Sequence, residues 1–255
     1  MSRTLLRATS LILFIGLSFS ISGQAYGQEL DSPPDLSGTW VKELVLTSTY
    51  RIALVTRFTN RATTYLLLKV VQEGTDISIE NEVCRIDMED SAPGFRPELP
   101  DAFLRTLPKG QRQGSVRWED GQYRLHIDRG WDIQGARLRD PNRESLPESA
   151  DDPRVFDQEG DGYPGFTVHI HGPLGGSIHL ARRNWDIMEG PILSSSRVEG
   201  DVEWQSEQNV LEASRRILRT SPTTTPDLDR STFRMVRVAS TTTCTEVARR
   251  GSQFF

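Results

Sequence analysis

Alternation of apolar and polar residues along most of the chain constrains its fold more than any other feature. Residues 63–72 and 76–88 show this period-two pattern on either side of Glu73-Gly74-Thr75, a hairpin connection that contains glycine. Long apolar stripes with the 3.6-residue period of a helix are absent. About eight or more such strands predict an all-β fold, an antiparallel barrel or a sandwich. We favour the barrel because closure removes strand edges, and no expected strand carries the charges that protect an edge.

The clearest local prediction is a hairpin between residues 115–118 and 123–127. Asp120 and Gly121 separate these two alternating runs, and a two-residue Asp-Gly turn provides the positive φ angles that such a hairpin needs. One face of the hairpin should then carry Val116, Trp118, Tyr123, Leu125 and Ile127.

Further strands and two short helices complete the expected barrel. A short helix is expected within residues 97–108, where Asp101 precedes an apolar group between two prolines, and another within residues 206–218. Residues 52–59 fit either a strand or a short helix, and a bulge is expected near residues 80–82. The remaining strands are expected at residues 41–47, 166–171, 177–183, 192–195, 201–205 and 232–239.

The N-terminus has the three parts of a secretory signal. Arg3 and Arg7 precede an apolar run at residues 11–21, and a small-x-small cleavage site follows, ending at Gly27. We therefore expect a cleaved signal at residues 1–27 and a single barrel-like domain at residues 28–255. The run is shorter than the roughly 20 residues that span a bilayer, although an uncleaved anchor is the alternative. No other stretch is apolar enough to cross a membrane.

Charge and cysteine content narrow the class of protein further. Removing residues 1–27 takes away two arginines and no acid, so the net charge of −5 becomes −7. An acidic chain lacks the basic surface that nucleic-acid binding needs. Cys84 and Cys244 are the two cysteines of the chain, and we expect a disulfide from an early strand to the last one, with two free thiols as the alternative. Together these features predict an exported protein, periplasmic or secreted.

An acidic loop at residues 139–165 contains the strongest candidate metal site. Asp157, Glu159 and Asp161 alternate as in a calcium loop, Gly162 follows, and the carbonyl of Tyr163 falls at the next ligand position. The bidentate acid of an EF-hand is missing because Val168 stands there. We therefore expect weak Ca²⁺ binding, with a solvated acidic turn as the alternative.

The string that follows this loop resembles a motif of one bacterial group. Gly160-Asp161-Gly162 continues through Pro164-Gly165 to Thr167, which is similar to an acidic Gly-Asp-Gly-x-Pro-Gly-x-Thr motif in uncharacterised exported proteins of Gram-negative bacteria. The resemblance implies a place in the cell envelope and implies no activity.

A second resemblance concerns the first expected strand. Gly38-Thr39-Trp40 is similar to the Gly-x-Trp of lipocalin-like barrels, where the tryptophan plugs the closed end. The resemblance implies an up-and-down barrel with a cavity for an apolar small molecule. We take Trp40, Trp118 and Tyr123 as candidate ligand-binding residues, although a core tryptophan at the start of any strand would give the same pattern.

Two weaker patterns involve histidine and tryptophan. If residue 171 pairs with residue 177, then His169, His171 and His179 lie on one hairpin face and could hold Zn²⁺, although a one-residue slip would separate them. Residues 131–133 and 185–187 both read Trp-Asp-Ile, by duplication or by chance.

The leading functional hypothesis is non-catalytic binding of a small apolar or amphipathic ligand in the barrel. The alternatives are a calcium-stabilised structural or surface module and an envelope metalloenzyme that uses the histidine face. No residue is assigned a catalytic role because motifs for nucleophilic catalysis and for phosphate binding are absent from the sequence.

Overall fold

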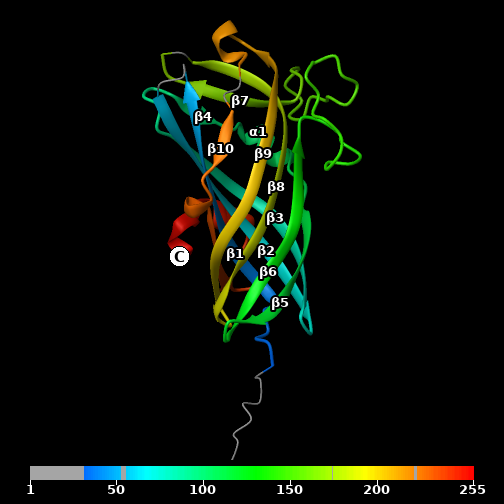
Figure 1. Cartoon of the computed structure of the whole chain (residues 1–255), viewed down its shortest axis with the longest axis vertical. Coiled ribbons are helices and arrows are strands. Elements are labelled where there is room, and N and C mark those ends of the chain that lie inside the picture. Colours follow the sequence, from blue (N-terminus) through cyan, green and yellow to red (C-terminus); the bar gives the residue numbers. More distant parts are fainter. Residues whose placement is uncertain (1–31, 53–55, 174, 221–222) are drawn as a thin grey trace, which may run out of the picture. The chain divides into compact units, whose positions relative to one another are not determined.

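Antiparallel strands wind into a closed ring, which Figure 1 shows from the side. The computed structural model describes residues 32–52, 56–173, 175–220 and 223–255. Within these residues, eight strands pair in the order β1–β2–β3–β5–β6–β8–β9–β11 and back to β1, which confirms the predicted antiparallel barrel. Their bounds are β1 (Gly38–Ile52), β2 (Thr56–Glu73), β3 (Asp76–Asp90), β5 (Gly110–Glu119), β6 (Gln122–Gln134), β8 (Gly176–Ser194), β9 (Arg197–Ala213) and β11 (Thr232–Val238).

The other elements lie at one end of the ring or on its outside. β4 pairs with β7, and β7 pairs with β8 beyond the end of β6. These strands and α1 mark the upper end in Figure 1, and the turns between β2 and β3 and between β5 and β6 mark the lower end. The bounds are β4 (Arg96–Glu98), α1 (Asp101–Thr106), β7 (Phe166–His171), η1 (Arg216–Leu218), β10 (Thr224–Pro226), η2 (Leu228–Arg230), α2 (Cys244–Arg250) and η3 (Gly251–Phe254).

The ring and these elements form one unit, Pro33–Phe255. The predicted signal, residues 1–27, lies outside the described residues, as does part of the ambiguous segment at residues 52–59. No helix among the described residues is long and apolar enough to cross a lipid bilayer.

The local turn chemistry acts as the sequence predicts. Asp120 and Gly121 have φ angles of 51° and 80°, and they join β5 to β6. Val116 pairs with Leu125 and Trp118 with Tyr123, so these residues share one face. The predicted helix between the two prolines is α1, which begins at Asp101.

The helix expected within residues 206–218 is wrong. Residues up to Ala213 continue β9, and Arg216–Leu218 alone forms a single 3₁₀ turn. The sequence misleads here because Ser206 and Gln208 are polar although they lie on the inward face, opposite Asn184 and Arg182 of β8. Pairing with β8 outweighs local helix propensity.

The bulge in β3 lies later than expected and positions the disulfide. Leu66 pairs with Val83 and Tyr65 pairs with Arg85, so Cys84 is the extra residue. A bulge turns neighbouring side chains to one side of the sheet, and here Cys84 faces α2. The predicted bond to Cys244 is confirmed, with a Cα–Cα distance of 5.1 Å. Cys244 opens α2 instead of lying in the last strand, which ends at Val238.

An apolar core fills the lower part of the ring. Trp40 is fully buried at the start of β1, and its indole Nε1 donates to the Leu36 carbonyl at 2.8 Å. Arg237 of β11 covers the indole, with its guanidinium carbon 4.7 Å from the ring centre. Gly38 has a φ of 141°, and a Cβ there would collide with the Arg237 guanidinium, so this position needs glycine. The core also contains Leu68, Val70, Ile77, Ile79, Val116, Leu125, Ile127, Met188, Val198, Val202, Phe233 and Met235.

A second apolar cluster lies at the upper end. Phe103 of α1 is fully buried against Phe166 of β7, with the two ring centres 5.0 Å apart. Ile86 and Met88 of β3 and Val210 of β9 pack on this cluster from the ring wall. The interior of the ring is therefore apolar at both ends.

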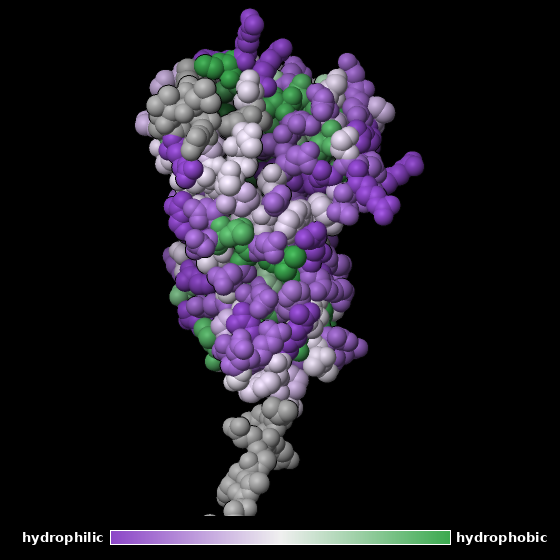
Figure 2. All heavy atoms as spheres, viewed as in Figure 1, coloured by the Kyte–Doolittle hydropathy of each residue, from purple (hydrophilic) through white to green (hydrophobic). Residues whose placement is uncertain are grey.

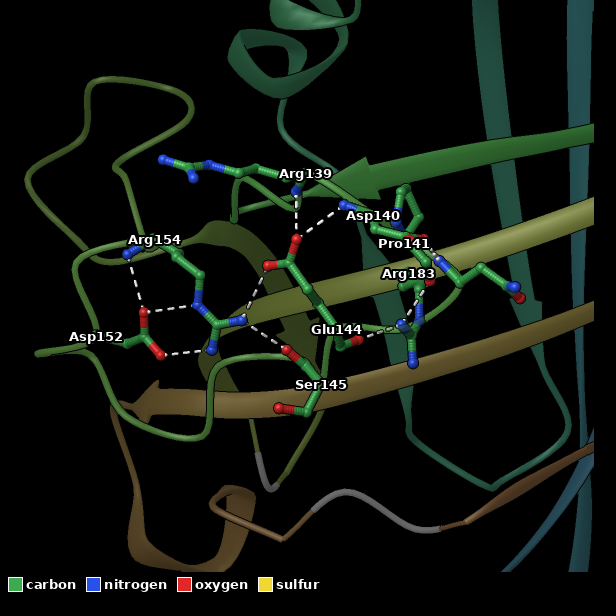
Figure 3. Close-up of polar contacts among 9 residues, drawn as sticks. Arg139, Asp140, Pro141, Glu144, Ser145, Asp152, Arg154 and Arg183 are labelled. Carbon is green, nitrogen blue, oxygen red and sulfur yellow. Dashed lines mark hydrogen bonds and ion pairs between the residues drawn. The ribbon is translucent and has the colours of Figure 1, made fainter.

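The acidic segment between β6 and β7 is folded against the ring, as Figure 3 shows. The Glu144 carboxylate accepts from the backbone N–H groups of Arg139 and Asp140, both at 2.8 Å. Arg154 pairs with Asp152 at 2.7 Å and donates to the Ser145 carbonyl. From β8, Arg183 reaches the Glu144 carbonyl and anchors the segment. These hydrogen bonds and ion pairs hold the polar connection against the ring.

Candidate functional site

A layer of charged side chains lies inside the ring, between the two apolar clusters. On β1, Lys42 shares the inward face of Trp40, and on β8, Asp186 shares the inward face of Met188. Gly130, Asp132 and Gln134 of β6 lie opposite Asp186, Asn184 and Arg182 of β8. Ionisable side chains are rarely placed in an interior without a partner or a function. The ionisable members of this layer are Lys42, Arg112, Asp132, Arg182 and Asp186.

Arg112 and Asp186 form the first ion pair of the layer. Arg112 Nη1 donates to both carboxylate oxygens of Asp186, at 2.9 and 3.2 Å. The two side chains keep only 13% and 18% of their surface accessible. Arg112 Nη2 also donates to the carbonyls of Asp128 and Asp186. The Nε atom of the same guanidinium is buried and has no hydrogen-bond partner among the described residues.

Arg182 and Asp132 form the second pair, joined through Gln134. Arg182 Nε donates to Gln134 Oε1 at 2.7 Å, and Gln134 Nε2 donates to the Asp132 carboxylate. Burial raises the pKa of Asp132, and the Arg182 guanidinium opposes this rise. Neighbouring Asn184 has a buried Oδ1 atom without a partner among the described residues.

Lys42 is the cation of the layer without a carboxylate of its own. Its side chain is 3% exposed, and its Nζ donates to the Met188 sulfur at 3.6 Å. A thioether is a weak acceptor, so this contact compensates little of the lost hydration. Burial lowers the pKa of Lys42 to about 8, while Asp186 acts to raise it and Arg112 acts to lower it. Lys42 therefore stays mostly protonated at neutral pH.

Side chains above this layer keep accessible surface although they face the interior. Leu44 and Leu46 continue the inward face of β1, and they pair with Thr64 and Ala62 of β2. All four are only partly buried, in contrast to the core below them. Asp132 keeps much of its surface accessible, although the protein around its carboxyl group removes enough water to raise its pKa. Accessible surface of this kind indicates that the ring is less tightly filled here than at its lower end.

The three aromatic residues predicted to bind a ligand lie at the lower end. Trp40 belongs to the filled core. Trp118 is 50% exposed at the tip of the β5–β6 hairpin and packs edge-on against Tyr123, with ring centres 4.8 Å apart. The structure thus brings Trp118 and Tyr123 together and places all three residues at the end opposite α1. Their role in ligand binding stays a prediction.

The predicted calcium residues are occupied by hydrogen bonds within their own loop. Asp157 accepts from the backbone N–H groups of Gly160, at 2.8 Å, and Gly162, at 2.7 Å. Glu159 accepts from the Thr167 N–H at 2.6 Å, and Asp161 accepts from the Thr167 hydroxyl. These bonds turn the carboxylates toward the backbone. Among the described residues, no three His, Cys, Asp or Glu side chains are grouped to hold a metal ion, and calcium binding stays a prediction.

The histidines of the β7–β8 hairpin have a different strand register from the one that the zinc hypothesis assumed, and one of them stacks on Tyr163. Tyr163 stacks on His179, with ring centres 4.2 Å apart, and His179 Nδ1 lies 3.0 Å from the Thr167 hydroxyl. His179 lies opposite Thr167 and His169 opposite Ser177, so the register is shifted by two residues from the expected one. The Nε2 atom of His171 lies 2.7 Å from a carboxylate oxygen of Glu98. The expected pairing of residues 171 and 177 is therefore wrong, but a shift of two residues keeps the three histidines on one face of the hairpin, as predicted.

Sequence reasoning did not identify the interior charged layer, although one signal marked it. The repeated Trp-Asp-Ile places Trp131 opposite Trp185 on neighbouring strands, and each following aspartate then points inward. The repeat thus marked Asp132 and Asp186, the two carboxylates of the layer. Lys42 and Arg112 stand in segments with no comparable repeat.

Inside the ring, the charged layer provides hydrogen-bonding groups, and Leu44, Leu46 and the upper apolar cluster form apolar walls above it. Such a combination suits the binding of a molecule with a polar and an apolar part. A pocket of about 560 Å³ opens at the upper end, lined by residues 88–96 with His171 and Gly172.

No protein-family model matches the chain, and no curated protein or solved structure is detectably similar to it.

Proposed function

We propose that this protein binds a small amphipathic molecule inside the ring and does not transform it chemically. One observation carries the proposal: a layer of inward-facing charged side chains, with Lys42 buried among them, lies between two apolar clusters, and inward-facing residues beside it keep accessible surface. A charged layer of this kind destabilises a barrel that has only a structural role. A ligand with a polar head would offset that cost.

The two parts of the ligand would have distinct surroundings. The head would lie at Lys42 and Arg112, and the apolar part would follow Leu44 and Leu46 toward the upper cluster. We place the entrance at the 560 Å³ pocket because Met88 belongs both to the wall of that cluster and to the lining of the pocket. The outer face seen in Figure 2 is mostly hydrophilic, with hydrophobic residues in small separate groups. On this face, no large hydrophobic patch among the described residues offers an alternative to the apolar interior of the ring.

Export to the periplasm or the exterior belongs to the same proposal. The Cys84–Cys244 disulfide supports it because such bonds persist in oxidising compartments. The signal features at Arg3, Arg7 and residues 11–21 support it independently. A carrier in the envelope would need a stable, pre-formed interior that protects an apolar molecule from water.

The proposal is tested by filling the interior. N-phenyl-1-naphthylamine is a neutral probe whose fluorescence rises in apolar surroundings, and it should bind the wild type. Ala62→Trp places a large side chain on the inward face between Leu46 and Met88 and should abolish the signal. Arg61→Trp puts the same side chain on the outward face of the same strand and should bind like the wild type. Equal binding by both variants would contradict a site inside the ring.

A further inference from the structure

We infer that the ligand carries a single negative charge and that its anionic head, of carboxylate type, binds between Lys42 Nζ and Arg112 Nε. This inference rests on the proposed function, because it names the chemical class of the molecule that enters the ring. It follows from the charge balance of the layer, from two donors that lack strong acceptors, and from the space that one glycine leaves for Arg112.

The charge balance requires one more anion. The layer contains three cations and two carboxylates, and each carboxylate is engaged by an arginine: Asp186 by Arg112, and Asp132 by Arg182. Lys42 is the remaining charge, and the charged groups that act on it are Asp186 and Arg112. The raised pKa of Asp132 can only increase the positive excess. A buried charge without a counter-ion is unfavourable, and a monoanion would neutralise it.

The donors of the layer point to the same class of ligand. Lys42 has three N–H donors, and the Met188 sulfur is the acceptor that the structure gives them. Arg112 Nε is a buried donor without a partner among the described residues. An ammonium and a guanidinium N–H in the same interior layer match the two oxygens of a carboxylate. A neutral head such as an alcohol would satisfy a donor and would leave the charge unbalanced.

Gly130 keeps the Arg112 guanidinium in its place. A Cβ at residue 130 would overlap the Cζ and Nε atoms of Arg112. Gly130 lies opposite Asp186 on the neighbouring strand, so the guanidinium crosses the glycine to reach that carboxylate. This route fixes the guanidinium through its Nη atoms and leaves Nε without an acceptor among the described residues.

The lysine content of the chain allows a clean experiment. The sequence has three lysines, Lys42, Lys69 and Lys109, and all other basic side chains apart from histidine are arginines. The side chains of Lys69 and Lys109 are 68% and 54% exposed on the outside of the molecule. Lys69 is a matched control because it lies on β2, the strand next to Lys42.

The test compares dodecanoate with dodecanol as competitors of N-phenyl-1-naphthylamine. The two molecules share a chain length and differ in the charge of the head. In the wild type, dodecanoate should displace the probe at a concentration about ten- to a hundredfold lower than dodecanol, the range that a charged hydrogen bond provides. Lys42→Met should remove this preference and leave dodecanol displacement unchanged. Lys69→Met should behave like the wild type.

Each outcome of the comparison decides one point. Equal displacement by dodecanoate and dodecanol in the wild type would overturn the anionic head, and so would an unchanged preference in a folded Lys42→Met variant. The wild-type comparison needs no variant, so it decides even where a substitution disturbs folding. Failure of the probe to bind the wild type at all would instead contradict the proposed function, and the two failures are thereby distinguishable.

Discussion

Replacing Lys42 by methionine should make the ligand-free protein more stable. Methionine keeps the length and the apolar stem of lysine, and it removes an ammonium that is 3% exposed and bonded to a thioether. The pKa of Lys42 falls from 10.5 to about 8 on burial. A shift of this size corresponds to roughly 3 kcal/mol of unfavourable free energy for the charged form at neutral pH. We therefore expect Lys42→Met to raise the free energy of unfolding by about 1–3 kcal/mol.

Asp186→Asn should have the opposite effect in the same layer. The substitution keeps the shape of the side chain and removes the charge that Arg112 contacts at 2.9 Å. Arg112 and Lys42 would then lie close together without a carboxylate between them. Breaking a buried ion pair in this way costs about 3–5 kcal/mol. Urea denaturation of both variants at pH 7 measures the difference.

The pH dependence of stability gives an independent check on Lys42. Between the folded pKa of about 8 and the unfolded value of 10.5, the unfolded chain binds the proton more tightly. Wild-type stability should therefore rise between pH 8 and 9.5, and Lys42→Met should lack this rise. Burial raises the pKa of Tyr50 and Tyr65, which opposes the rise at higher pH. A Lys42→Met variant that is less stable than the wild type at pH 7 would refute the reasoning.

Three further predictions concern other parts of the chain. Gly130→Ala should destabilise the fold by about 1–3 kcal/mol, because its Cβ overlaps the Arg112 guanidinium, and an unchanged urea midpoint would contradict this. Replacing Cys84 and Cys244 by alanine should cost about 2–5 kcal/mol, since the bond closes a loop of 160 residues, and thermal unfolding with and without reductant measures the loss. The predicted calcium site should raise the melting temperature in millimolar CaCl₂ and not in NaCl of equal ionic strength, and Asp157→Asn should remove the effect.

The wall of the ring was predictable because its signals are local. The Asp120-Gly121 turn requires φ angles that few other residue pairs adopt, and the structure has them. An even number of cysteines in a chain with the features of a secretory signal suggested the bond between Cys84 and Cys244. These features depend on neighbouring residues or on pairing chemistry, and tertiary packing does not change them.

The charged layer was not predictable because its residues break the rule on which the strand prediction depends. On β1, Lys42 faces inward, whereas Glu43 faces outward and is buried beneath Arg234, with Nη2 and Oε1 2.6 Å apart. Alternation alone would assign a lysine to the solvent side. In the same way, Ser206 and Gln208 of β9 are polar residues on the inward face. Because of them, the sequence pattern predicted a helix where the structure has a strand. The exceptions gather at the candidate site, where the function that we propose would outweigh the usual hydrophobic pattern.

Native mass spectrometry of the protein incubated with dodecanoate tests the central claim, a ligand site inside the ring, most directly. The account predicts one dodecanoate bound per chain in the wild type and none in Ala62→Trp, the variant with a blocked interior. Arg61→Trp, with the same substitution on the outward face, should retain the one-to-one complex. A wild type that binds no dodecanoate, or binding that is equal in Ala62→Trp and Arg61→Trp, would contradict the claim.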